Sequence, residues 1–133
     1  MYSLSDKSKK ALVGVHPDLV RLVQAVMAKQ VVDFSVHEGL RDEVTQKVYL
    51  ANGVSKTIKS KHLKQPDGYG HAVDLYPYPI DMLAVTKGDE REIVKFGVLA
   101  GIMLATAKEM GIKIRWGGYW KSPFDCPHFE LDL

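Results

Sequence analysis

The sequence has almost no cysteine, little net charge and no long apolar run, and each shortage excludes a class of protein. Cys126 is the single cysteine, so no disulfide can form within the chain. The formal net charge of +2 is too small for a dedicated nucleic-acid binder. The longest uncharged apolar stretch, residues 96–107, is shorter than the ~20 residues that cross a bilayer. We expect no nucleic-acid partner, no stable membrane insertion and a buried helix over residues 96–107.

The N-terminus also lacks the pattern of a signal peptide. Residues 1–7 contain no basic stretch followed by an apolar one, so we expect a protein that needs outside help to leave the cytoplasm. A chain of 133 residues with 46% hydrophobic content can bury one sizeable core. We therefore expect a single domain over residues 1–133, acting as a monomer.

Helix and strand signals follow one another in an order that predicts an α+β fold. Capping residues and apolar periodicity predict helices over residues 5–12, from 17 onward, 42–51 and 89–110. Alternation and β-branched residues predict strands over residues 31–36, 71–76, 112–116 and 128–131. Pro77 and Pro79 are expected to end the second strand, and Gly111 the last helix. The order favours a small domain whose mainly antiparallel sheet is flanked by helices.

Histidine and acidic residues occur in a split set that suits a metal ion. His62 lies in a polar stretch, Asp74 interrupts an apolar strand, and His128 opens the last expected strand. A buried carboxylate without a partner is costly, so Asp74 is expected to be paired or to bind metal. Two imidazoles and one carboxylate can hold a catalytic zinc ion with one position open for water. The sequence therefore predicts a metallohydrolase.

His71 competes with His62 as the partner of Asp74. Side chains alternate across a strand, so His71 and Asp74 would point to opposite faces of a regular strand over residues 71–76. This favours His62 as the ligand and leaves His71 a surface role or a role behind the ligands.

The segment around the last strand supplies further candidates. His128 and Glu130 should share one face while the two apolar residues between and after them face the core, which would hold His128 rigidly. Glu130 is then expected to orient a histidine or to form an ion pair. Asp125, in a loop stiffened by Pro123, could reach a metal-bound water or could be an ordinary loop acid. Cys126 is better explained as a small packed residue than as a ligand.

Arginine and tryptophan side chains complete the set of candidates. Arg41 follows a strand and a glycine, so its charged fork could hold a carboxylate or an oxyanion, although many such arginines are surface residues. Trp116 and Trp120 come shortly before the Asp125–His128 loop. They could form a wall for an extended substrate or belong to the core.

Taken together, these residues resemble the phage-type L-alanyl-D-glutamate endopeptidases, zinc peptidases whose wider family includes D-Ala-D-Ala carboxypeptidases and dipeptidases. The resemblance covers nearly the whole chain. It rests on LS at 4–5, GVHPDL at 14–19, DF at 33–34, EGLR at 38–41, ANGVS at 51–55, SKH at 60–62, GHAVDL at 70–75, WGG at 116–118 and PHFEL at 127–131.

The resemblance implies an antiparallel sheet that carries the zinc site, and it implies a role for each candidate. The zinc ligands would be His62, Asp74 and His128, with Asp125 as catalytic acid/base and Arg41 stabilising the oxyanion or anchoring the substrate. The residues implied in substrate binding or in support of the ligands are Ser60, Trp116, Trp120 and Glu130. Eleven residues separate His62 from Asp74, more than the family's usual spacing. The extra residues, around 64–69, are expected to bulge out at the rim of the cleft.

The function implied is cleavage of the bond between L-Ala and D-Glu in the stem peptide of peptidoglycan. A phage endolysin of this kind would stay in the cytoplasm of the infected host until release to the periplasm and cell wall. One alternative is a D-Ala-D-Ala carboxypeptidase or dipeptidase, which uses the same metal site. Another is a metal-bearing binding domain without activity, which the presence of both Asp125 and Arg41 disfavours.

Overall fold

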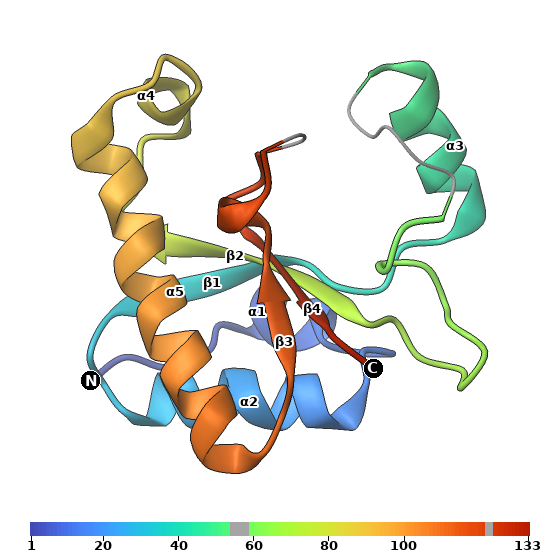
Figure 1. Cartoon of the computed structure of the whole chain (residues 1–133), viewed down its shortest axis with the longest axis horizontal. Coiled ribbons are helices and arrows are strands. Elements are labelled where there is room, and N and C mark those ends of the chain that lie inside the picture. The colour runs from blue at the N-terminus through green and yellow to red at the C-terminus, as the bar shows by residue number, and fades with distance from the viewer. Residues whose placement is uncertain (54–58, 122–123) are drawn as a thin grey trace.

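A four-stranded antiparallel sheet with the order β1-β2-β4-β3 forms the centre of the computed structural model (Figure 1). The structure describes residues 1–53, 59–121 and 124–133. The strands are β1 (Asp33–Glu38), β2 (Ala72–Tyr78), β3 (Ile114–Trp116) and β4 (His128–Leu131). Together with the flanking helices they confirm the expected small α+β domain. Two stretches singled out in the sequence, residues 54–55 and Pro123, lie outside the described residues.

Helices flank the sheet and begin and end largely where local signals place them. They are α1 (Asp6–Ala11), α2 (Pro17–Ala28), α3 (Glu43–Ala51), α4 (Met82–Thr86), α5 (Glu90–Met110) and the 3-10 helix η1 (Gly117–Tyr119). The side chains of Ser5 and Asp42 cap α1 and α3, and Gly111 ends α5 in the left-handed conformation. The sequence analysis missed α4 and η1 because each is too short to show helical periodicity.

The alternation of side chains along the strands separates the core from the site. Helices α2 and α5 pack against each other along one side of the sheet (Figure 1). The sheet residues buried with them in one cluster are Phe34, Val36, Val73, Leu75, Phe129 and Leu131. Asp74 and His128 pair directly across β2 and β4, and point to the opposite face. The same pairing therefore builds the core on one side and the site on the other.

The strand boundaries differ from the predicted ones, most clearly at Pro77. Strand β2 continues through Pro77 to Tyr78, although proline was expected to end it. The amide of Leu75 donates to the Pro127 carbonyl on the β4 side, so the nitrogen of Pro77, two residues on, faces the same side. Strand β4 does not extend as far as Pro77, since its pairing with β2 stops at Asp74. The missing N–H of Pro77 therefore costs no hydrogen bond between the strands. Strand β1 is shifted towards Glu38, and β3 begins two residues later than predicted.

Helix α5 is amphipathic rather than buried throughout, which corrects the expectation for residues 96–107. Leu99 and Met103 are buried, whereas Val98 is 49% exposed and Ala105 is exposed as well. In the part of the chain that the structure describes, no helix has both the length and the apolar character needed to cross a membrane.

Two glycines offer a test of how closely the elements pack. A Cβ on Gly39 would lie 2.0 Å from the Ala11 carbonyl oxygen and 2.8 Å from a Val15 methyl group. Gly39→Ala should therefore lower the free energy of unfolding by about 1–3 kcal/mol, measured by urea denaturation. Gly101, inside α5, has nothing within 4 Å of its Cβ position, so Gly101→Ala should raise that free energy by about 0.5–1 kcal/mol. Equal stability of the two variants would contradict the close approach of α1 to Gly39.

Candidate functional site

Three side chains from distant parts of the sequence meet on the open face of the sheet. His62 precedes β2, Asp74 lies on β2 and His128 begins β4, and one ligand atom of each lies within 4.8 Å of the others. His62 Nε2 and His128 Nδ1 are both 3.3 Å from the same carboxylate oxygen, Asp74 Oδ1. Both imidazoles are buried, at 2% and 6% exposure. The arrangement brings together the three residues that the sequence favoured as ligands.

The surroundings of Asp74 fit a metal ion. Its Oδ1 atom is buried and makes no hydrogen bond with any described residue, although two imidazole nitrogens lie close to it. Such an orphaned oxygen is costly unless a cation or a proton satisfies it. Burial alone would raise the pKa of Asp74, but the interactions with His128 and His62 hold it well below its usual range. An ionised carboxylate and two imidazoles form a donor set that suits zinc and other transition metals.

The outer nitrogen of each histidine is held, which aims the inner nitrogen at the shared position. His62 Nδ1 lies 2.8 Å from the Gly39 carbonyl oxygen, and an N–H there donates to it. His128 Nε2 lies 2.9 Å from Glu130 Oε1, beside it on the same strand face. Burial lowers the pKa of His128, but Asp74 and Glu130 outweigh that effect and raise it to about 9. These partners fix the ring orientations that a metal site requires.

His71 lies apart from this group, as strand alternation predicts, but it is not at the surface. It is 7% exposed, and its Nε2 lies 2.7 Å from Asp67 Oδ2. His16 lies 3.8 Å from the same oxygen. The loop around residues 64–69 thus packs against His16 and His71. None of its residues is among the described residues that line the main cleft, so the expectation of a loop at the cleft rim is wrong.

A cleft of about 820 Å³ lies over the three candidate ligands. Asp125 lies in its wall with its side chain 40% exposed, and Asp125 Oδ2 is 3.8 Å from His128 Nδ1. Burial and the nearby charge of Asp74 raise the pKa of Asp125 against the opposing effect of His128 and the other cations. A carboxyl group with a raised pKa, open to the cleft, suits the transfer of a proton.

Arg41 lines the cleft, and three contacts hold its side chain in place. Its Nε donates to Glu38, its guanidinium lies 2.5 Å from Gln46 Oε1, and the same group lies 4.6 Å over the ring of Tyr49. The guanidinium is therefore held in place rather than free in solvent. Sequence reasoning missed these supporting residues, although Glu38 stands within the EGLR motif.

Of the remaining candidate residues, some line the cleft and others support the residues that line it or pack in the core. Trp120 lines the cleft with its ring 5.1 Å from that of His128, whereas the Oγ of buried Ser60 accepts from the His62 amide. Trp116 is not among the described residues that line the cleft, and it packs on Phe129 instead. Cys126 is buried and lies outside the ligand group, consistent with a packed residue.

Tyr76 is a cleft residue that the sequence analysis overlooked. It lies on β2 two positions after Asp74, on the same face, and its ring stacks on that of His37 at 4.4 Å. The alternation that placed Asp74 would also have placed Tyr76. Both aromatic rings extend the cleft wall beyond the ligands.

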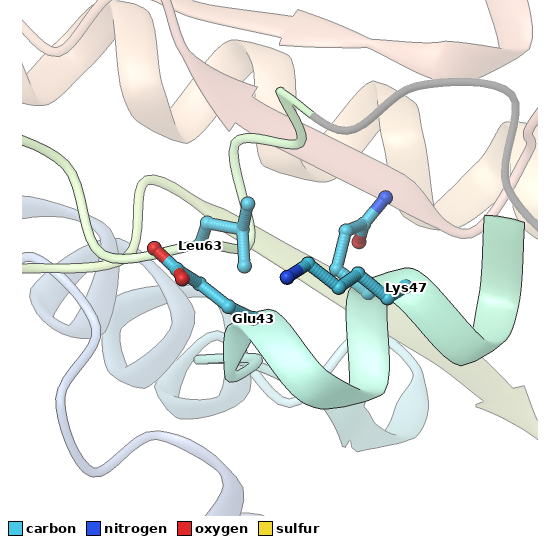
Figure 2. Close-up of a pocket in the computed structure, with 4 residues that line it drawn as sticks. Glu43, Lys47 and Leu63 are labelled. Atoms are coloured by element: carbon cyan, nitrogen blue, oxygen red, sulfur yellow. The ribbon is translucent and has the colours of Figure 1, made fainter.

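A second, smaller pocket of about 230 Å³ lies beside α3 (Figure 2). Glu43 and Lys47, one turn apart on α3, face Leu63 across it, and Gln46 also lines it. Gln46, which lines this pocket, also bonds Arg41, so the pocket adjoins the support of the arginine.

Comparison with known proteins identifies the family. A model of the family described as phage L-alanyl-D-glutamate peptidase matches residues 1–131. The chain belongs to this family. It is 28% identical over 133 residues to the L-alanyl-D-glutamate peptidase of Escherichia phage T5, covering 98% of this chain and 89% of the phage protein. It also resembles the crystal structure of the Serratia marcescens L-Ala D-Glu endopeptidase ChiX, with a TM-score of 0.77, 36% identity and coverage of 98% and 90% of the two chains. The chain is thus a peptidase, as the sequence predicts.

Metal binding tests the ligand group directly. Zinc-loaded protein is expected to keep about one ion per chain after dialysis, since three protein ligands form a standard catalytic zinc site. His62→Ala and His128→Ala should each lose the ion, and His71→Ala, the matched control, should keep it. Metal content is measured by mass spectrometry, with circular dichroism to confirm folding. If His62→Ala keeps the zinc ion and His71→Ala loses it, the ligand is His71 and not His62.

Proposed function

We propose that this protein is a zinc-dependent endopeptidase that cleaves the L-Ala–D-Glu bond of peptidoglycan stem peptides, with residues 1–133 forming one catalytic domain. The observation that carries the proposal is the orphaned Asp74 oxygen between two imidazoles, with the Asp125 carboxyl group beside them in an open cleft. Membership of a peptidase family supports the reaction class.

His62, Asp74 and His128 would hold the zinc ion. A zinc ion held in this way supplies Lewis acidity and lowers the pKa of a water molecule to about 7. His62 and His128 are both buried, so they shield the site from bulk water on the side that faces the sheet.

Asp125 would move the proton. It accepts a proton from the water that attacks the L-Ala carbonyl carbon, and it delivers that proton to the amine of D-Glu as the C–N bond breaks. Its raised pKa and its partial exposure to the cleft support this role, which is usually worth about 10²–10⁴-fold in rate.

Arg41 would offset the negative charge that develops on the carbonyl oxygen during attack. Its contacts with Glu38, Gln46 and Tyr49 hold the guanidinium before substrate arrives, so little reorganisation is needed at the moment of reaction. A permanently charged arginine also suits the carboxylates of an acidic stem peptide.

The choice of bond rests on the relatives. The phage T5 protein and ChiX are both named for the bond between L-Ala and D-Glu, which favours an endopeptidase over a carboxypeptidase that removes terminal D-Ala. The cleft is open and carries Trp120 and Phe124 beside charged residues, as suits an extended peptide. We propose that the protein acts as a monomeric endolysin, made in the cytoplasm of an infected host and released to the cell wall.

Replacement of Asp125 separates proton transfer from metal binding. Asp125→Asn should keep zinc and fold, yet lose about 10²–10⁴-fold in kcat, because the amide cannot accept the proton. Glu109→Gln, which alters an exposed acid paired with Lys29 on the surface, is the control and should keep full activity. Loss of zinc from folded Asp125→Asn would show instead that Asp125 is a ligand.

Digestion of purified peptidoglycan tests the bond. The products should carry new D-Glu amino termini and leave L-Ala on the lactyl-muramic acid, with glycan strands uncut, as read by mass spectrometry. Free D-Ala as the main product would favour the carboxypeptidase alternative. No cleavage of any wall preparation by the zinc-loaded protein would favour a binding domain.

A further inference from the structure

Strand β3 lies at the edge of the sheet and carries neither a proposed ligand nor the proposed base. Its residues nevertheless contact Glu130, which bonds the proposed ligand His128, and the backbone next to the proposed base Asp125. Arg115 and Trp116 are adjacent on this strand, and Gly117 follows directly. We propose that these three residues form the positioning element of the site: Trp116 and Gly117 hold Asp125, and Arg115 holds Glu130, which orients His128. The inference rests on the roles proposed above for Asp125 and His128.

The backbone on either side of the Asp125 side chain is tied to the end of β3. The indole Nε1 of Trp116 donates to the Cys126 carbonyl oxygen at 2.7 Å, and the Asp125 amide donates to the Gly117 carbonyl oxygen at 3.1 Å. The ring of Trp116 is itself stacked on buried Phe129, with centroids 6.4 Å apart. The loop that carries the Asp125 carboxyl group is therefore tied to the end of β3 and to the residue that follows it.

Gly117 makes this close approach possible. A Cβ at this position would lie 2.2 Å from the Asp125 carbonyl oxygen and 3.0 Å from the Asp125 Cβ. Any side chain at residue 117 would push Asp125 away from β3. The requirement is for space, because the nearest atom is a backbone carbonyl oxygen, which cannot rotate aside as a flexible side chain could.

The second support reaches the ligand His128 through Glu130. Arg115 and Glu130 face each other across β3 and β4, and the guanidinium NH2 group donates to Glu130 Oε2 at 3.1 Å. The other oxygen, Oε1, accepts from His128 Nε2 at 2.9 Å. Glu130 is thus bonded at both oxygens, one to each partner, and its side chain is buried at 9% exposure.

Because the two supports hold different groups, their loss should have different effects. Weakening the hold on Asp125 should slow turnover and leave zinc in place, since a shift of about 1 Å in a reacting group can cost about 10²-fold. Weakening the hold on Glu130 should lower zinc affinity, since partners of ligands typically contribute about 10–100-fold. A strand with only a structural role would instead affect stability and both properties together.

Trp116→Phe tests the first support, because it keeps the aromatic packing and removes the N–H donor. We expect kcat to fall about 10–100-fold with KM and zinc affinity little changed, and hydrogen exchange at the Asp125 amide to accelerate. Gly117→Ala should have the same effects. Tyr119→Phe is the matched control, since it removes a polar atom from a ring 5.0 Å from Trp116, and it should leave kcat unchanged. An unchanged kcat and exchange rate in Trp116→Phe would overturn the first support.

Arg115→Met and Glu130→Gln test the second support. Each should weaken zinc binding about tenfold in competition with a chelator, and the double variant should be no weaker than Glu130→Gln alone, because Arg115 acts through Glu130. Arg21→Met, which removes an arginine paired with Asp18 on α2, is the control. Wild-type affinity in Arg115→Met, or additive losses in the double variant, would overturn it.

Two of these readouts need no turnover, which separates this inference from the proposed function. If the wild-type protein cleaves no peptidoglycan, but zinc affinity and amide exchange change as expected, the positioning role stands and the proposed function fails. If the wild-type protein is active but the variants match it in every readout, the positioning role alone is wrong.

Discussion

The burial of the Asp74 carboxylate is the constraint on which the rest of the site depends. Asp74 lies between Val73 and Leu75, which are fully buried, so a slip of one residue in β2 would place the acid in the core and an apolar side chain in the cleft. The register that pairs Asp74 with His128 is therefore also the register that builds the core. The cost of burying the carboxylate is offset by two imidazoles and, in the proposed enzyme, by the metal ion they share.

The site combines positions on strands with positions on loops. Asp74 and His128 lie on paired strands, which hold a coordination geometry well, whereas Arg41 and Asp125 lie on connecting segments. Each loop residue is tied to something more rigid: Arg41 to Glu38 at the end of β1, and Asp125 to Gly117 after β3. Loop residues can carry the proton and charge chemistry here because neighbouring elements supply the rigidity that loops lack.

Much of the fold could be predicted from local patterns. Helix α5 runs from its Asp89 cap to Gly111 as expected, and the residues of β4, at the predicted positions, lie alternately in the cleft and in the core. The failures have physical causes. A proline is tolerated in β2 because the neighbouring strand has ended, and the loop over residues 64–69 packs against His16 rather than at the cleft. Neither fact is encoded in the residues nearby.

The sequence by itself determined which segments form helices and strands, and which side chains share a strand face, because capping and alternation act over a few residues. It also carried the motifs of the peptidase family. Strand alternation favoured His62 over His71, but only the tertiary structure decided that Glu38 and Gln46 hold Arg41, and that Trp116 bonds the loop of Asp125 instead of lining the cleft. These contacts join residues through the pairing of separate strands and through loops without periodicity, so no local pattern specifies them.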